Sequence, residues 1–256
     1  MKMKFLGPFA ALLLLPALVA AQSACPVLVI TGHPTYMPVA WAADGKIAGA
    51  ASELVTGIAK KSGVTTVASK DYGSWESAQA AVARGEADVI FGIYKNDERM
   101  TWLDYVEPAF MMDPVSVVVR KGDGFAYALW DDLKGRKGVT NAGESFGTAF
   151  DGFMAKNLTV ARAQGVDKAF AALLNKSADY LIIGLYPGSL EARRLGIGSK
   201  VEFLAKEIDS FGMYVGFSKK SKCNELKAAF AEGLKQQVAD GRVKVLLDAA
   251  RRQLEK

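Results

Sequence analysis

Strand-like and helix-like segments alternate along this chain, and this alternation constrains its fold more than any other feature. In the first half, short apolar runs typical of strands occur at 27–31, 64–68 and 88–93. Segments with the helical spacing of apolar residues lie between them, at 51–61 and 74–84. Strands that alternate with helices usually pair in parallel, so this order predicts a parallel sheet with helices on its faces.

A second strand–helix alternation follows in the middle of the chain, without a low-complexity linker before it. The further predicted elements are strands 115–119, 138–140, 180–185, 201–204 and 213–217, a helix that begins at 143, and helices 167–174, 189–195, 224–238 and 243–250. We therefore expect an α/β protein built from two α/β units. Strands such as 115–119 and 211–217 are expected to pass between the units, which places a ligand cleft there.

Residues 1–21 have the layout of a secretory signal peptide. Two lysines provide a positive start, residues 5–19 are largely apolar, and small residues lead to Ala21. The apolar run is short for a membrane span, so we expect cleavage after Ala21 and an exported, soluble mature protein. A lipoprotein anchor at Cys25 is the alternative, and Gln22 at the third position before that cysteine disfavours it.

The charge balance argues against nucleic acid as a partner. The 256-residue chain has 32 basic and 27 acidic side chains, which gives a net charge of +5. Removal of residues 1–21 takes away two lysines and no acids, which leaves 30 − 27 = +3. No block of Lys and Arg with interleaved aromatic residues occurs, so we expect no nucleic-acid binding.

Two cysteines, Cys25 and Cys223, remain in the expected mature chain. An even number in an exported protein permits one disulfide, and we favour a structural disulfide over two free thiols. His33 is the only histidine, and no ligand pair has the spacing of a zinc site. We therefore expect neither a metal nor a cofactor.

The segment 88–110 runs from a predicted buried strand into a charged loop that carries Arg99. Most arginines are solvated surface charges, and that interpretation stays open here. However, Arg99 follows a strand end, where a cleft is expected, and its guanidinium could hold a carboxylate through two parallel hydrogen bonds. Four aromatic residues near strand ends or a helix start could line the same pocket, although each is more often ordinary packing: Tyr36, Trp75, Phe91 and Tyr94.

Residues 143–147, with the sequence Gly-Glu-Ser-Phe-Gly, allow three interpretations. The pattern matches the nucleophile elbow of hydrolases, but in those enzymes the histidine follows the serine, whereas His33 precedes Ser145. A second interpretation is an anion site formed by the Ser145 hydroxyl and the backbone N–H groups of Ser145, Phe146 and Gly147 at a helix start. The third is that Ser145 simply caps its helix.

Several short motifs occur in order along the chain. They are Pro34-Thr35-Tyr36-Met37-Pro38, Gly85-Glu86-Ala87-Asp88-Val89-Ile90, Glu98-Arg99 followed by Tyr105-Val106-Glu107-Pro108-Ala109-Phe110, Gly138-Val139 with Gly143, and Ala178-Asp179-Tyr180. Their order and spacing, more than any single motif, resemble the family 3 periplasmic solute-binding proteins, which are the receptors of polar amino acid ABC transporters. The resemblance covers nearly all of residues 25–250.

This resemblance implies two α/β lobes joined by two hinge strands, with a ligand cleft between them (the type II periplasmic-binding fold). Lobe one would comprise residues 22–115 and 206–256, and lobe two residues 116–205. Cys25 and Cys223 would then lie in the same lobe, which agrees with a disulfide. The implied protein is a periplasmic monomer that closes on an amino acid or related small carboxylate, without covalent chemistry, and delivers it to an inner-membrane ABC permease.

The resemblance also implies roles for individual residues. Arg99 would bind the ligand's α-carboxylate with help from Ser145, and Tyr36 would stack on the ligand. Three strand-end residues would accept hydrogen bonds from the α-ammonium: Gly92, Ile93 and Tyr94. The full set of candidate ligand-binding residues is Tyr36, Trp75, Phe91, Gly92, Ile93, Tyr94, Arg99, Ser145, Phe146 and Tyr186.

Two departures from the family pattern leave the ammonium contact open. Gly184 stands where the family usually has an acidic residue that pairs with the α-ammonium, and the stretch 88–99 is one residue shorter than usual. Either Glu144 or another acid takes this role, or the ligand is not an α-amino acid. The alternative function is an enzyme on the same scaffold, such as a periplasmic cyclohexadienyl dehydratase with Glu144 as general acid or base. A sensor-input protein that presents ligand to a membrane receptor is a third.

Overall fold

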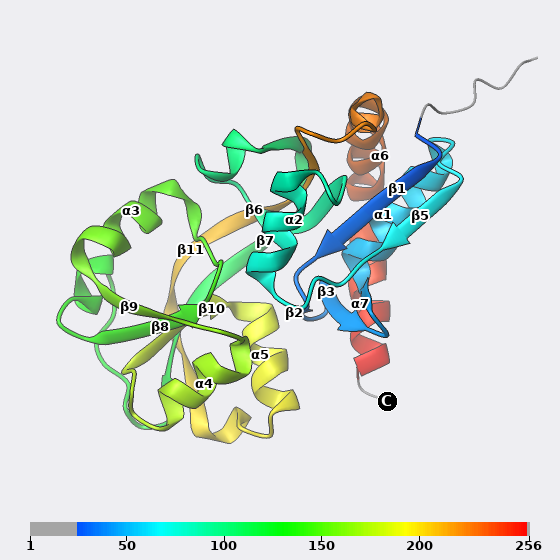
Figure 1. The fold of residues 1–256 in the computed structure, drawn as a ribbon. Helices are drawn as coiled ribbons and strands as arrows, with labels where there is room; N and C mark the ends of the chain where they lie inside the picture. The colour runs from blue at the N-terminus through cyan, green and yellow to red at the C-terminus, as the bar shows by residue number, and fades with distance from the viewer. Residues whose placement is uncertain (1–24, 255–256) are drawn as a thin grey trace, which may run out of the picture.

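The computed structural model describes residues 25–254 as two lobes that lie side by side and are joined by two long strands (Figure 1). One eight-stranded sheet runs through both lobes in the order β5-β1-β6-β11-β7-β10-β8-β9. Its strands are β1 (Val27–Gly32), β5 (Thr66–Ser69), β6 (Val89–Tyr94), β7 (Leu103–Arg120), β8 (Lys137–Asn141), β9 (Thr159–Ala163), β10 (Tyr180–Gly184) and β11 (Val201–Ser218). The predicted α/β class with two lobes is confirmed.

Each lobe contains the parallel sheet that the strand–helix alternation predicted. In lobe one, β1 pairs in parallel with both β5 and β6, and in lobe two β8 pairs in parallel with β10 and β9. The strands β7 and β11 run antiparallel to their neighbours and belong to both lobes. The sequence analysis did not predict β9, because this edge strand is largely exposed and carries no continuous apolar run.

The two connecting strands are much longer than predicted. Both β7 and β11 span 18 residues, whereas the predicted strands were 115–119, 201–204 and 213–217. Most residues in the middle of each strand are half-buried or exposed where it passes between the lobes, so no continuous buried run marks it in the sequence. The predicted lobe boundaries, near 115 and 205, fall inside these two strands and stay a prediction.

The loop predicted at 33–38 contains a short strand. Thr35 and Tyr36 pair antiparallel with Trp41 and Ala40, and a third strand completes a small separate sheet. Its members are β2 (Thr35–Tyr36), β3 (Ala40–Ala43) and β4 (Lys46–Ala48). This small sheet holds the Tyr36 side chain in a fixed position beside the end of β1.

Helices cover both faces of the sheet in each lobe (Figure 1). In lobe one, Val89 and Phe91 of β6 belong to the apolar cluster that includes α1, while Ile90 and Ile93 belong to the cluster that includes α2. The alternation over residues 89–91 follows from the two-residue period of a strand, and the irregular pairing with β11 at Gly92 places Ile93 in the same cluster as Ile90. The helices are α1 (Ala50–Lys61), α2 (Trp75–Arg84), α3 (Gly147–Asn157), α4 (Val166–Leu174), α5 (Leu185–Arg194), α6 (Lys227–Ala239) and α7 (Arg242–Leu254).

Some helix boundaries could be predicted from the sequence, and others could not. The Ser74 side chain accepts a hydrogen bond from the Ser77 N–H, and Gly85 ends α2 in the left-handed conformation, as predicted. The predicted strand 180–185 instead ends at Gly184, and α5 begins at once rather than at 189. Tyr186 therefore lies in the first turn of a helix.

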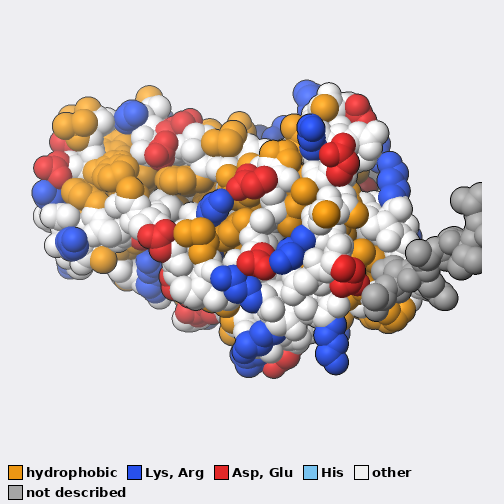
Figure 2. All heavy atoms as spheres, turned by 90° about the horizontal axis from the view of Figure 1, so that it is seen from above, with side chains coloured by type: hydrophobic (Ala, Val, Ile, Leu, Met, Phe, Trp, Pro, Cys, Tyr) orange, Lys and Arg blue, Asp and Glu red, His pale blue; other side chains and the backbone are white. Residues whose placement is uncertain are grey.

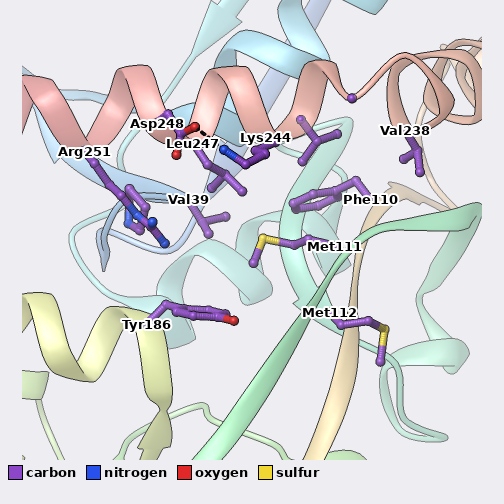
Figure 3. A pocket seen from close by; sticks show the side chains of 13 residues that line it. Val39, Phe110, Met111, Met112, Tyr186, Val238, Lys244, Leu247, Asp248 and Arg251 are labelled. Carbon is purple, nitrogen blue, oxygen red and sulfur yellow. Dashed lines mark hydrogen bonds and ion pairs between the residues drawn. The ribbon is translucent and has the colours of Figure 1, made fainter.

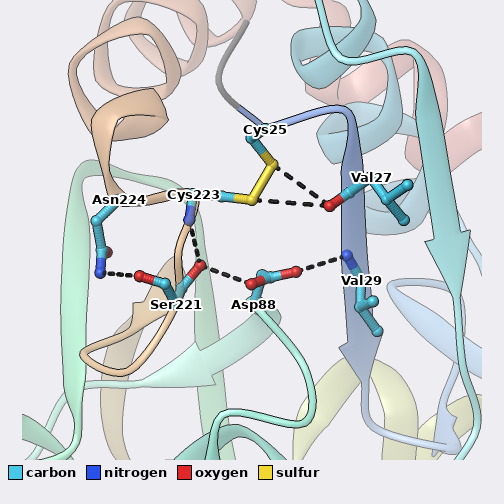
Figure 4. Close-up of a disulfide and its surroundings, with 7 residues drawn as sticks. All are labelled: Cys25, Val27, Val29, Asp88, Ser221, Cys223 and Asn224. Carbon is cyan, nitrogen blue, oxygen red and sulfur yellow. Dashed lines mark hydrogen bonds between the residues drawn. A yellow bond between two sulfur atoms is a disulfide. The ribbon is translucent and has the colours of Figure 1, made fainter.

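Cys25 and Cys223 form a disulfide across 198 residues of sequence, which confirms that prediction (Figure 4). Beside it, the Ser221 hydroxyl donates to the Asp88 carboxylate at 2.7 Å, and the same carboxylate accepts from the Val29 N–H at 2.9 Å. The bridge and these bonds tie the start of β1 to the segment that follows β11. They lie at the opposite end of β1 from Gly32, where the lobes meet.

The predicted signal peptide, residues 1–21, lies outside the described residues. Within 25–254, no helix has both the length and the apolar character that crossing a membrane requires.

Candidate ligand cleft between the lobes

The segment 141–148, which connects β8 to α3, lies against lobe one. Six polar contacts join this segment to lobe-one residues. Two of them reach His33 Nε2, from Asn141 Nδ2 at 3.2 Å and from Glu144 Oε1 at 3.1 Å, and two reach the Gly143 carbonyl, from Gln79 Nε2 and from Arg99 Nη2, each at 3.0 Å. The other two join Asn96 Nδ2 to Ser145 Oγ at 2.6 Å and the Asp97 N–H to Thr148 Oγ1 at 3.2 Å. We call the region between the lobes here the interlobe cleft. It lies at the C-terminal ends of β1, β6 and β8, where parallel sheets commonly bind ligands.

Arg99 is buried in the interlobe cleft, with only 1% of its surface exposed, so its interpretation as a surface charge is wrong. Its guanidinium donates to Gln79 Oε1 at 2.9 Å, to the Tyr94 carbonyl at 2.9 Å and to the Gly143 carbonyl at 3.0 Å. All three acceptors are neutral, and among residues 25–254 no carboxylate forms an ion pair with Arg99. Burial lowers the pKa of Arg99, although Tyr105 and the carboxylates of Glu144, Asp151 and Glu98 act in the opposite direction.

Tyr36, Tyr94 and Asp113 form a buried hydrogen-bonded group in the same cleft. Each tyrosine hydroxyl lies 2.7 Å from Asp113 Oδ2, and the two hydroxyl oxygens are 2.6 Å apart. Burial raises the pKa of Asp113 to about 6, although the tyrosine hydrogen bonds act in the opposite direction. Burial, followed by the charge of Asp113, raises the pKa values of both tyrosines. The sequence analysis missed Asp113, whose only signal is an acid between the apolar residues 109–112 and the predicted strand 115–119.

The region around Gly184 explains why no acid stands at that position. A Cβ atom on Gly184 would lie 2.7 Å from Asp113 Oδ2 and would overlap the Tyr36 hydroxyl. The carboxylate of Asp113, which comes from β7, therefore occupies the space that a side chain at position 184 would need. A carboxylate is therefore present in this part of the cleft, but it comes from Asp113 of β7 rather than from position 184.

His33 is a second cleft residue that the candidate ligand set did not contain. Its Nδ1 accepts a hydrogen bond from the Thr35 N–H at 3.0 Å, and its Nε2 lies 3.1 Å from Glu144 Oε1 and 3.2 Å from Asn141 Nδ2. Its ring also packs against Trp75 and Tyr36, with centroid distances of 4.9 and 5.2 Å. The sequence signal that could have identified His33 as a cleft residue is its position, as a polar residue directly after the first strand.

Ser145 does not form the pair that a nucleophile elbow would need. Its hydroxyl donates to Asp151 Oδ2 at 2.5 Å and accepts from Asn96, while His33 bonds to Glu144 instead. The N-cap of α3 is Phe146 rather than Ser145, and the Phe146 N–H donates to Asp151 Oδ1 at 2.8 Å. The carboxylate of Asp151 thus satisfies the predicted anion site at this helix start.

The remaining lobe-one candidates divide between the cleft and the core. Trp75 is buried at the start of α2 and, with His33, lines a small cavity of about 100 Å³ between the lobes. The side chains of Phe91 and Ile93 are fully buried and belong to two different apolar core clusters. Gly92 adopts a φ of +70°, which turns the strand end above them.

Tyr186 lies apart from Arg99, in a second cavity of about 470 Å³ (Figure 3). Figure 3 shows its ring facing α7 across this cavity, with Met111 and Met112 of β7 on one side. The Arg251 guanidinium lies 5.8 Å from the centre of the Tyr186 ring. The structure therefore does not join Tyr186 to the group around Arg99.

The described residues contain no candidate metal site, and charges of both signs are mixed on one face of the molecule. Among residues 25–254, no group of three His, Cys, Asp or Glu side chains is placed to hold a metal ion. Figure 2 shows acidic and basic side chains interspersed over one face, with apolar side chains gathered on the lobe that carries α3. The ionisable side chains described in the cleft are those of Arg99, Asp113, Glu144, His33 and the two tyrosines.

Three solved structures show how widely this fold is shared. A mutant of ArgBP from T. maritima is 18% identical, with a TM-score of 0.71 and coverage of 89% of this chain and 96% of that one. The amino acid ABC transporter substrate-binding protein AbpA from Streptococcus pneumoniae, bound to L-arginine, is 21% identical, with a TM-score of 0.72 and coverage of 90% and 97%. A histidine kinase sensor domain similar to periplasmic binding proteins is 22% identical, with a TM-score of 0.70 and coverage of 90% and 96%. At these identities, the likeness shows the fold alone.

The sequence comparison is more specific than the structural one. No curated protein sequence matches the chain. However, the family model of bacterial extracellular solute-binding proteins, family 3, matches residues 28–249, which is most of the chain and includes every cleft residue described above. The chain belongs to the bacterial extracellular solute-binding proteins of family 3.

Proposed function

We propose that this protein is exported to the periplasm and captures an amino acid or related small carboxylate between its lobes. The observation that carries this proposal is Arg99, a buried guanidinium in the interlobe cleft whose acceptors are all neutral. A buried charge without a counter-ion is costly, and a ligand carboxylate would provide one. Two similar structures hold amino acids, L-arginine in one case and glutamine in the other, which supports this ligand class.

Binding would exchange a neutral acceptor for a charged one. The Gly143 carbonyl accepts a hydrogen bond from Arg99 Nη2 at 3.0 Å in this structure. A ligand carboxylate in its place would form a stronger, charge-assisted hydrogen bond. Because Gly143 belongs to lobe two and Arg99 to lobe one, entry of the ligand requires the segment 141–148 to move away from lobe one. The ligand would then stabilise the closed arrangement by contacting both lobes.

The two long strands would act as the hinge for this movement. The pairing of β7 with β11 shifts register between Phe203 and Asp209 and again between Met213 and Val215. Irregular pairing at these points supports bending between lobe one, proposed as 22–115 and 206–256, and lobe two, proposed as 116–205. The closed protein, acting as a monomer, would deliver its ligand to an inner-membrane ABC permease.

The test is a ligand screen followed by calorimetry on Arg99→Ala. A thermal-shift panel of amino acids, amino-acid derivatives and plain carboxylates should give saturable binding without chemical turnover. Arg99→Ala should weaken the best ligand by about 2–5 kcal/mol, because it removes one partner of a buried charge pair. Arg84→Ala is the matched control, since Arg84 is exposed and pairs with Glu86 at the end of α2. Unchanged affinity in Arg99→Ala would contradict the carboxylate assignment.

An enzyme on this scaffold is the second candidate, and one observation favours it. The raised pKa of Asp113, about 6, would let this carboxyl group act as a general acid near neutral pH. Product analysis on every ligand from the panel separates the two functions. Chemical conversion of any ligand at a rate that Asp113→Asn abolishes would replace the receptor proposal with the enzyme.

A further inference from the structure

The second cavity, about 470 Å³ in volume, has walls from both lobes and from one of the strands that connect them. Tyr186 at the start of α5 lines it from lobe two, and α7 lines it from lobe one. The connecting strand β7 contributes Phe110, Met111 and Met112. Small-molecule sites in proteins usually measure roughly 300–1,000 Å³, so this cavity has the size of a ligand site.

The wall of this cavity is mostly apolar. Figure 3 shows Val39, Met111 and Leu247 in the space between the Tyr186 ring and α7. Two of the lining side chains keep much of their surface in contact with solvent, since Met112 is 55% exposed and Tyr186 is 37% exposed. A hydrocarbon group in the cavity would remove this apolar surface from water, which favours binding.

Three charged side chains line the same cavity, and two of them pair with each other. Lys244 Nζ lies 2.7 Å from Asp248 Oδ2. Arg251 forms no ion pair with any residue in 25–254. Figure 3 shows its side chain directed from α7 toward Tyr186, and its guanidinium lies 5.8 Å from the centre of that ring. Two cations and one anion give the lining a net charge of 2 − 1 = +1.

This combination of an apolar wall and one available cation restricts the ligand. A carboxylate beside Arg251 would form a charge-assisted hydrogen bond, whereas a cationic group would be repelled. A small polar solute would leave the apolar wall without a partner. The ligand that uses both features has a hydrocarbon part and a single anionic end.

We propose that the second cavity is a binding site for a small hydrophobic carboxylate. Its hydrocarbon part packs between Met111, Leu247 and Tyr186, and its carboxylate binds Arg251. Neither Arg99 nor any of its hydrogen-bond acceptors lines this cavity, so the site is separate from the interlobe cleft and does not depend on the proposed function. Because the walls come from both lobes, the bound acid contacts both and stabilises the lobe arrangement that forms the cavity.

The first test is calorimetry of octanoate and decanoate on the native protein. Both acids should bind saturably, and decanoate should bind about 15-fold more tightly, because each additional buried methylene group contributes roughly a factor of four. Absence of saturable binding by both acids, or equal affinities for the two chain lengths, would overturn the assignment. A concentration-dependent dimer, detected by sedimentation in a protein that binds neither acid, would identify a second copy of the chain as the occupant instead.

The second test locates the carboxylate with Arg251→Gln. This variant should bind octanoate about fivefold more weakly, the upper range for a partly exposed ion pair, and should bind the uncharged octan-1-ol as the native protein does. Arg252→Gln is the matched control, because Arg252 is the next residue of α7, is exposed and does not line the cavity. An equal loss of octanoate affinity in the two variants, or an equal loss for octan-1-ol in Arg251→Gln, would overturn the contact with Arg251.

Arg99→Ala distinguishes this site from the interlobe cleft. Octanoate affinity should be the same in Arg99→Ala as in the native protein, since Arg99 does not line the second cavity. If octanoate affinity falls in Arg99→Ala and not in Arg251→Gln, the acid binds in the interlobe cleft. That result would overturn the second site and leave the proposed function intact.

Discussion

At the scale of single residues, the interlobe cleft contains charges that the fold itself leaves uncompensated. Burial lowers the pKa of Arg99 and raises the pKa of Asp113, so both ionised forms are disfavoured in the ligand-free protein. Such groups reduce stability, and proteins commonly carry them at functional sites. Under the proposed function, a ligand carboxylate bound at Arg99 would recover part of this cost.

Asp113 should make stability depend on pH in a specific direction. Its folded-state pKa of about 6 exceeds the value of about 3.9 for an unfolded chain, so the folded protein binds this proton more tightly. Ionised Asp113 therefore destabilises the fold above pH 6, and this effect disappears as the pH falls towards 4. The difference corresponds to about 3 kcal/mol.

Urea denaturation of the native protein and Asp113→Asn between pH 4 and pH 7 measures this effect. The variant should be the more stable protein at pH 7, and the two should converge towards pH 4. Four titratable groups act on Asp113, namely the hydrogen-bonded Tyr36 and Tyr94 and the more distant Glu144 and Glu207. Parallel stability curves across the whole range would show that Asp113 is not the group responsible.

Individual residues also show which parts of the cleft could be predicted from the sequence and which could not. Arg99 could be predicted as a cleft residue because it follows a strand end in a parallel sheet. Asp113 could not, since its significance depends on Tyr36, Tyr94 and Gly184, which lie far from it in the sequence. The same applies to the pairing of His33 with Glu144, which joins residues 111 positions apart.

At the scale of helices and strands, local signals predicted the buried elements and missed the exposed ones. The cap residues Ser74 and Gly85 delimit α2 as predicted, and the apolar run before Tyr94 is a fully buried strand. The long strands β7 and β11 appeared only as fragments, because their middle parts leave the core between the lobes. Helix α5 began earlier than predicted because Gly184 continues directly into it.

The junction of β10 and α5 should tolerate no side chain at Gly184. In Gly184→Ala, the new Cβ would lie 2.7 Å from Asp113 Oδ2, which forces that carboxylate or Tyr36 to move. We expect the free energy of unfolding to fall by about 1–3 kcal/mol, as for other overpacked sites. Urea denaturation, together with the affinity for the best ligand, measures both effects.

Gly57→Ala in the middle of α1 is the matched control, because nothing lies within 4 Å of a Cβ atom there. It should stabilise the protein by about 0.5–1 kcal/mol through helix propensity. Equal effects of the two substitutions would show that the contact between Gly184 and Asp113 does not constrain this junction.

At the scale of the whole molecule, the disulfide lies apart from the proposed ligand cleft. The disulfide closes lobe one at the start of β1, whereas the interlobe cleft lies beyond the other end of that strand. The bridge links residues 198 positions apart, so it restricts the unfolded chain strongly. The proposed lobe movement along β7 and β11 would not require any change near this bridge.

Removal of the disulfide should therefore affect stability more than binding. The double variant Cys25→Ser, Cys223→Ser should lose about 2–5 kcal/mol of the free energy of unfolding. Its affinity for the best ligand, measured by calorimetry below its thermal midpoint, should match that of the native protein. A large loss of affinity in well-folded variant protein would show that the bridge also shapes the cleft.

The most direct test of ligand capture by the interlobe cleft is a crystal structure of the protein with its tightest-binding amino acid. We expect the ligand carboxylate within about 3 Å of the Arg99 guanidinium, in place of the Gly143 carbonyl. A ligand found in the second cavity beside Tyr186, with Arg99 still bound to the Gly143 carbonyl, would contradict this assignment.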